Sequence, residues 1–65
     1  MRIGIDVGGT NTDAVLMDGS EVRGWRKTPT TPDVGTGIVS VLKELLFEAK
    51  IKASDIQSVM IGTTH

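Results

Sequence analysis

Apolar residues alternate with small or charged residues at the start of the chain. In residues 2–7 (RIGIDV) every second position is apolar, and this period of two is typical of a β-strand. Residues 12–17 and 21–27 form two more β-rich runs, and Asp18-Gly19 between them is a hairpin signal. The pattern predicts three strands that pair as an antiparallel meander.

The third of these runs is basic, with Arg23, Arg26 and Lys27. A binding site for anions is one interpretation of these charges. The simpler interpretation is an edge strand whose charges discourage pairing with other chains, and we favour it because the run lies at the end of the meander.

Residues 28–32 (TPTTP) should be irregular, because Pro29 and Pro32 lack N–H donors. Beyond this Thr-Pro segment the apolar spacing changes to steps of three and four between Ile38 and Ala49. This spacing predicts an amphipathic helix that ends near residue 50. We expect Thr31 to be the N-cap, Pro32 the first helical residue and Asp33 a member of the first turn.

Two glycines fall near the start of this helix. Gly35 and Gly37 each lower helix stability by about 1 kcal/mol relative to Ala, so we expect them to serve close packing. After the helix, Ser54 and Gln57 form a possible capping box for a short turn.

A fourth apolar run, residues 58–61, predicts another strand. A helix between two strands implies a crossover to a parallel neighbour, which places this strand beside the first one. The predicted fold is α/β, with a mixed sheet ordered 3-2-1-4 and one crossover helix. Ligands of such sheets bind outside the carboxyl ends of parallel strands, where the loop after Val7 and the segment Gly62-Thr63-Thr64 would lie together.

Composition narrows the class of protein. The 65 residues are 38% hydrophobic with a formal charge of −1, which fits one small domain. No cysteine is present, which excludes disulfides and thiolate metal sites. The near-neutral charge and the scarcity of aromatic residues argue against nucleic acid as a partner. No apolar run reaches the roughly 20 residues of a membrane helix, so we expect no membrane partner and a cytoplasmic location.

The stretch from Asp6 to Asp13 (DVGGTNTD) carries the candidate chemistry. Glycines allow backbone N–H groups to approach anionic oxygens, and the short side chains of Thr10, Asn11 and Thr12 add donors. These features predict a phosphate-binding turn. An ordinary β-hairpin turn remains the alternative, since Gly-Gly with a nearby Asn is common hairpin chemistry.

Asp6 favours the phosphate interpretation. It falls on the face opposite the apolar positions of its strand, where a carboxylate needs a cation or donors, and Mg²⁺ with nucleotide phosphates would supply the cation. Other phosphate motifs fit poorly. Gly4 and Gly9 have the Walker A separation, but Thr10 stands where that motif needs Lys.

The stretch IGIDVGGTNTDAVL resembles the first phosphate motif of the superfamily of actin, sugar kinases and heat-shock chaperone ATPases. Together with KTPTTP (residues 27–32) and IGTTH (residues 61–65), it is similar to the extreme N-terminus of hydantoinase A and 5-oxoprolinase proteins. Asn11 stands where many family members have an aromatic residue. The chain therefore looks closer to the N-methylhydantoinase and hydantoin-utilisation branch.

The resemblance implies a partial ribonuclease H-like or actin-like ATPase domain in a hydrolase that opens small cyclic amides with ATP and Mg²⁺. Asp6 would be catalytic through the metal, with Asp13 as a second metal ligand. The residues that the resemblance assigns to the phosphates are Gly8, Gly9, Thr10, Asn11 and Thr12, with Thr63 and Thr64 at the adjacent strand end.

Family members are much longer chains, so the resemblance implies that residues 1–65 are an N-terminal fragment that is inactive in isolation. A sugar or small-molecule kinase is one alternative for the parent protein. A non-catalytic module that binds a partner is another. One helix can cover only one face of the sheet. We therefore expect self-association, or contact with the remainder of the parent protein, through the face of Gly4 and Met60 and through the edge of the fourth strand.

Overall fold

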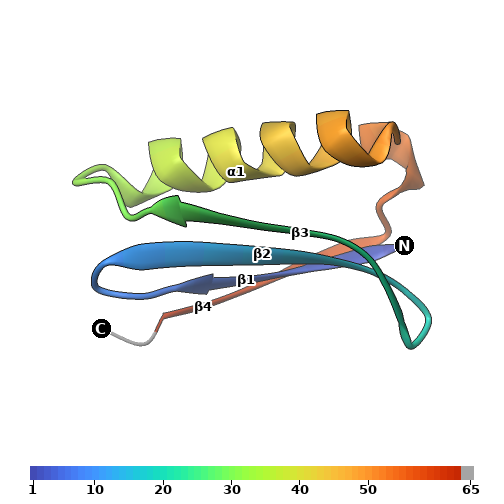
Figure 1. The fold of residues 1–65 in the computed structure, drawn as a ribbon, viewed down its shortest axis with the longest axis horizontal. Coiled ribbons are helices and arrows are strands. Elements are labelled where there is room, and N and C mark those ends of the chain that lie inside the picture. The colour runs from blue at the N-terminus through green and yellow to red at the C-terminus, as the bar shows by residue number, and fades with distance from the viewer. Residues whose placement is uncertain (64–65) are drawn as a thin grey trace.

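The computed structural model describes residues 1–63, which form a four-stranded sheet covered on one face by a helix (Figure 1). The sheet order is β3-β2-β1-β4, as predicted. The elements in chain order are β1 (Arg2–Val7), β2 (Asn11–Asp18), β3 (Glu21–Pro29), α1 (Val34–Ala49), the 3₁₀ turn η1 (Ala53–Asp55) and β4 (Ser58–Thr63).

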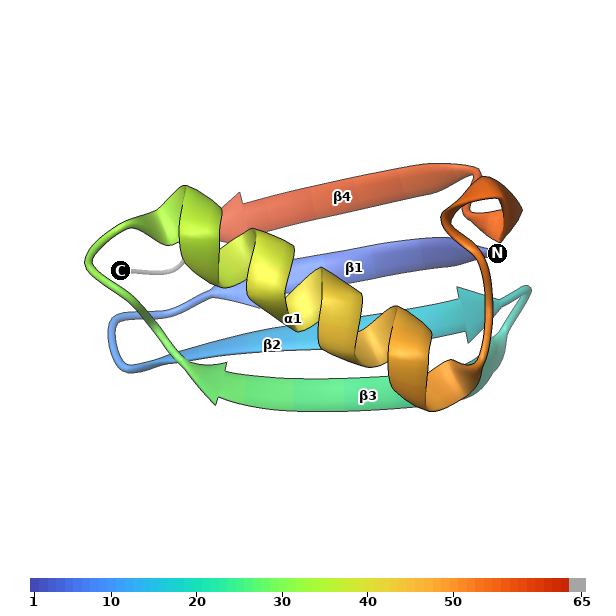
Figure 2. The ribbon, with the colours of Figure 1, turned by 90° about the horizontal axis from the view of Figure 1, so that it is seen from above.

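The pairing directions also confirm the predicted topology. β2 pairs antiparallel with both β1 and β3, whereas β4 pairs parallel with β1. The chain therefore crosses from β3 to β4 through α1, which runs diagonally over the sheet (Figure 2). None of the helices in residues 1–63 has the length and apolar character that a membrane crossing requires.

Strands β2, β3 and β4 are each longer than the sequence pattern predicted. β3 continues to Pro29, so the expectation of irregular structure from residue 28 is wrong for its first two residues. Pro29 is tolerated because it ends an edge strand, where the missing N–H removes no ladder bond to a further strand. β4 continues to Thr63, which places this predicted ligand residue inside the strand.

The helix begins at a different residue from the one predicted. Asp33, and not Thr31, is the N-cap, and its carboxylate accepts hydrogen bonds from the backbone and the hydroxyl of Thr36 at 3.4 and 2.7 Å. Pro32 therefore lies outside the helix. Thr31 instead donates its hydroxyl hydrogen bond to the carbonyl oxygen of Asp33. Thr and Asp are both favourable N-cap residues. Asp33 is the N-cap in this structure because the N–H and the hydroxyl of Thr36 both donate to its carboxylate.

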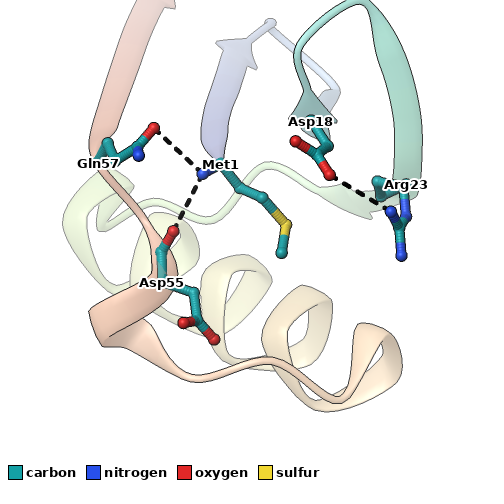
Figure 3. A network of polar contacts seen from close by, with 5 residues as sticks. All are labelled: Met1, Asp18, Arg23, Asp55 and Gln57. Atoms are coloured by element: carbon teal, nitrogen blue, oxygen red, sulfur yellow. Dashed lines mark hydrogen bonds and ion pairs between the residues drawn. The ribbon is translucent and has the colours of Figure 1, made fainter.

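The connection from α1 to β4 also differs in detail. The predicted capping box of Ser54 and Gln57 is wrong, because the backbone N–H of Lys52 donates to the carboxylate of Asp55 at 3.1 Å. The Gln57 side chain instead accepts a hydrogen bond from the terminal ammonium group of Met1 at 3.2 Å (Figure 3). This contact joins the start of β1 to the start of β4.

The core lies between α1 and the inner face of the sheet. Alternate strand residues and one stripe of the helix form it, as the periodicity predicted. Its fully buried members are Ile3, Ile5, Val7, Ala14, Leu16, Val41 and Leu45. Arg26 on β3 also joins the sheet to α1, because its guanidinium group forms ion pairs with Glu44 and Glu48 at 3.2 and 3.6 Å.

The opposite face of the sheet has no covering element among the described residues (Figure 1). A row across the four strands, Trp25, Val15, Gly4 and Met60, lines a shallow groove of about 450 Å³ on this bare face. The side chains of Trp25 and Met60 remain 57% and 72% exposed. Every residue of β4 is exposed as well, and the outer edge of this strand pairs with no other strand among the described residues.

Candidate functional site at the carboxyl end of β1

Three segments meet at one end of the sheet. They are the β1–β2 turn, the linker from β3 to α1 and the C-terminal end of β4 (Figures 1 and 2). Val7 is in register with Thr12 on β2 and with Thr63 on β4. The predicted proximity of the loop after Val7 and Thr63 is therefore confirmed. Thr64 and His65 lie outside the described residues.

We call residues 8–11 the glycine turn. The N–H of Gly8 donates to the carbonyl oxygen of Asn11 at 2.9 Å, which closes the turn with Gly9 and Thr10 at its tip. The described backbone takes positive φ values at Gly19 and Lys50, and not at Gly8 or Gly9. Tight hairpin turns of types I′ and II′ require positive φ, so their chemistry does not explain these two glycines. Glycine has no Cβ, which allows a ligand to approach its backbone closely, and this property suits a binding turn.

The tip of the glycine turn presents free donors. Within residues 1–63, the backbone N–H groups of Gly9 and Thr10 have no hydrogen-bond acceptor. Both residues are exposed, and so is Asn11, whose amide nitrogen donates to the Thr10 hydroxyl at 3.3 Å. Exposed N–H groups that converge at a turn are suited to anionic oxygens.

Two carboxylates lie two register steps behind the glycine turn, with Val7 and Thr12 between. Asp6 on β1 is directly opposite Asp13 on β2, and both belong to the bare face, because they alternate with the buried Val7 and Thr12. Lys27 on β3 places its ammonium group 3.9 Å from the Asp13 carboxylate. Asp6 has no ion pair within the described residues. Like charges directly opposite each other destabilise a sheet, and a bound cation would relieve this repulsion.

The described residues do not form a complete metal cage. No three side chains of His, Cys, Asp or Glu come together within residues 1–63. Mg²⁺ is usually held by one or two carboxylates together with water and phosphate oxygens. Asp6 and Asp13 fit the protein half of such a site, and the remaining ligands would have to come from a bound phosphate and water.

Thr12 differs from the other predicted phosphate residues. Its side chain is only 3% exposed and lies on the core face, away from Asp6 and Asp13. Its hydroxyl is 3.0 Å from the hydroxyl of Thr30 in the β3–α1 linker. The assignment of Thr12 to phosphate stays a prediction, and in this structure the residue connects the glycine turn to the linker. Thr30 was not identified as a site residue from the sequence. The Thr-Pro segment served there only as part of the motif that resembles the family.

The fold and this end of the sheet define the class of protein: an α/β domain whose mixed sheet presents a glycine turn and a carboxylate pair. The chain belongs to the hydantoinase/oxoprolinase family, because residues 2–65 match the family described as "Hydantoinase/oxoprolinase N-terminal region". No curated protein matches the chain significantly. The closer likeness to the N-methylhydantoinase branch stays a prediction.

Proposed function

We propose that this chain is the phosphate-binding N-terminal part of an ATP-dependent hydrolase that opens cyclic amides. The observation that carries the proposal is that the free N–H groups of Gly9 and Thr10 lie at the same end of the β1–β2 hairpin as the carboxylate pair of Asp6 and Asp13. Donors for phosphate oxygens and ligands for a divalent cation thus lie at the same end of the sheet. The membership of the hydantoinase/oxoprolinase family supports the choice of reaction.

In this proposal the glycine turn binds the β and γ phosphates of ATP, and Asp6, with Asp13 as its neighbour, holds Mg²⁺ or its water ligands. The metal would neutralise the charge that develops on the transferred phosphoryl group. The carbonyl oxygen of the cyclic amide takes the γ-phosphoryl group, and ADP leaves. Water then opens the ring and releases inorganic phosphate. The residue that activates the water would come from outside the described residues.

The match to an N-terminal family region supports placing these 65 residues in a longer protein. The groups that bind the adenosine and the cyclic amide would then come from the rest of that protein. An ATP-consuming reaction of this kind would take place in the cytoplasm.

The test is a balance of products in the full-length protein, with hydantoin or 5-oxoproline as the substrate and Mg-ATP as the co-substrate. We expect equal amounts of ADP, inorganic phosphate and ring-opened product, and no turnover when EDTA removes Mg²⁺. A kinase would instead leave the phosphate on its product and release none. Ring opening that proceeds at the same rate without ATP would contradict the proposal.

A further inference from the structure

The Thr-Pro segment that follows β3 has no role in the proposed reaction, yet it contacts the glycine turn. The hydroxyl of Thr30 donates to the carbonyl oxygen of Gly8 at 2.8 Å, and its backbone N–H donates to the carbonyl oxygen of Thr10 at 2.9 Å. Thr30 thus contacts the glycine turn at the residue before Gly9 and at the residue after it.

The third contact of Thr30 reaches the buried side chain of Thr12. A threonine hydroxyl has one proton to donate, and Thr30 donates its proton to Gly8. In the 3.0 Å contact between the two hydroxyl groups, Thr12 must therefore be the donor and Thr30 the acceptor. The Thr30 hydroxyl has both its donor and an acceptor site occupied, in a part-buried position where an unpaired polar group is costly.

The linker that carries Thr30 is itself fixed to the helix. The next residue, Thr31, donates to the carbonyl oxygen of Asp33, the N-cap of α1. The Thr31 side chain also packs against the buried Gly37, where a Cβ would lie 2.7 Å from the Thr31 hydroxyl. Thr30 is therefore held in place from the helix side and not by the glycine turn alone.

We propose that Thr30 is a positioning residue, which clamps the glycine turn in the conformation that presents the free N–H groups of Gly9 and Thr10. This inference rests on the proposed function for its ligand, the phosphates of ATP. Thr30 does not touch that ligand. It acts through Gly8, Thr10 and Thr12, whose positions its side chain and backbone determine.

The test compares three variants of the full-length protein. Thr30→Val keeps the shape of the side chain and removes both hydroxyl contacts, whereas Thr30→Ser keeps both. Thr28→Val is the matched control, because the Thr28 hydroxyl has no hydrogen-bond partner within residues 1–63. The readouts are hydrogen exchange of the Gly8 amide, whose N–H is hydrogen-bonded within the glycine turn, and the KM values for Mg-ATP and for the cyclic amide.

We expect Thr30→Val to raise both the exchange rate of the Gly8 amide and the KM for Mg-ATP about tenfold, the size expected when hydroxyl hydrogen bonds are lost and a buried partner is left unpaired. The KM for the cyclic amide should not change. Thr30→Ser and Thr28→Val should resemble the wild type in every readout.

Unchanged exchange in Thr30→Val would overturn the clamp. Faster exchange together with an unchanged KM for Mg-ATP, in an active enzyme, would overturn its role in positioning. If the wild-type protein shows no dependence on ATP, the proposed function fails, and the exchange data then decide the clamp by themselves.

Discussion

Gly37 approaches Thr31 so closely that a Cβ atom on Gly37 would lie 2.7 Å from the Thr31 hydroxyl oxygen. Gly35 lies two residues earlier, on the opposite side of the helix. A Cβ there would have its nearest neighbour, a carboxylate oxygen of Asp33, at 3.5 Å, which is an ordinary contact. The expectation of close packing is thus confirmed for Gly37, whereas nothing in the described residues requires the glycine at position 35.

The two glycines should respond in opposite directions to the same substitution. Gly35→Ala should stabilise the protein by up to about 1 kcal/mol, because alanine favours the helix and meets no obstacle. Gly37→Ala should destabilise it by about 1–3 kcal/mol, because Thr31 must move and its hydrogen bond to Asp33 is strained. Urea denaturation measures both effects. Equal changes in the two variants would contradict the close approach of Thr31.

The N-cap of α1 should make stability depend on pH. Hydrogen bonds from the Thr36 hydroxyl, and then from the Thr36 N–H, lower the pKa of the Asp33 carboxyl below its usual range. A depressed pKa contributes stability above the pKa of the unfolded chain, about 3.9, and this contribution disappears as pH falls through the folded value.

We therefore expect wild-type protein to lose stability below about pH 4 more steeply than Asp33→Asn, in which the cap does not titrate. The measurement is the urea midpoint at pH 7 and pH 3. Thr36→Val removes the hydroxyl donor and should bring the Asp33 pKa closer to its usual value in an NMR titration. An unshifted Asp33 pKa in the wild type would contradict the capping geometry.

Asp6 can be tested by a change that keeps its shape. In the full-length protein, Asp6→Asn removes the charge that the cation needs, and we expect turnover to fall by about 10² or more, as when one strong electrostatic contact is lost. Asp18→Asn is the matched control, since Asp18 is an exposed β2 carboxylate at the other end of the sheet. Normal turnover of Asp6→Asn at limiting Mg²⁺ would make Asp6 a structural residue.

The 65-residue chain by itself should bind ATP poorly. The described residues offer donors for phosphate, but the proposed adenosine and substrate contacts come from the rest of the protein. We expect a dissociation constant for Mg-ATP no better than about 1 mM, near 4 kcal/mol of binding free energy, and no nucleotide-dependent hydrolysis. Calorimetric titration is the measurement. A micromolar constant would contradict this division of the site.

The bare face and the open edge of β4 should cause the isolated chain to self-associate. At about 50 μM, sedimentation should report dimers, larger species or a poorly folded monomer, because exposed apolar surface and unpaired edges promote association at such concentrations. Met60→Lys places a charge on the bare face and should reduce the sedimenting mass. Phe47→Lys is the control, because Phe47 is 84% exposed on the outer side of α1. A compact wild-type monomer would contradict the prediction.

The strand order could be predicted from the sequence because hairpins join neighbouring strands and a crossover helix leads to a parallel one. The buried face of β1 could be predicted because burial follows periodicity. Ile3, Ile5 and Val7 are all buried, as their alternation indicated. The start of the helix could not be predicted, because Thr31 and Asp33 are both suitable N-caps by residue type. The folded chain decides between them, since Thr36 donates to Asp33 while Thr31 donates to the Asp33 carbonyl and packs against Gly37.

The candidate site, too, could be predicted from the sequence only in part. The glycine turn was recognisable by residue type, since Gly8 to Asn11 follow a strand and have short side chains. Thr30 was not recognisable, because its partner Gly8 is 22 positions away and a threonine between two prolines is typical of an exposed loop. Residue types identify chemistry within one turn, but contacts between distant segments depend on how the helix and sheet pack.

The parallel pairing of β1 with β4 has a consequence for the order of folding. The β1–β2 and β2–β3 hairpins join neighbouring segments, whereas Arg2 meets Ser58, 58 − 2 = 56 positions away, only after the whole intervening chain has closed into a loop. Closing a long loop costs more entropy, and β4, whose residues all remain exposed, buries little surface to offset that cost. We therefore expect β4 to join the sheet last and to leave it first, so that amide exchange is faster in β4 than in β2. The hydrogen bonds between β1 and β4 should therefore be the first interstrand bonds of this sheet to break.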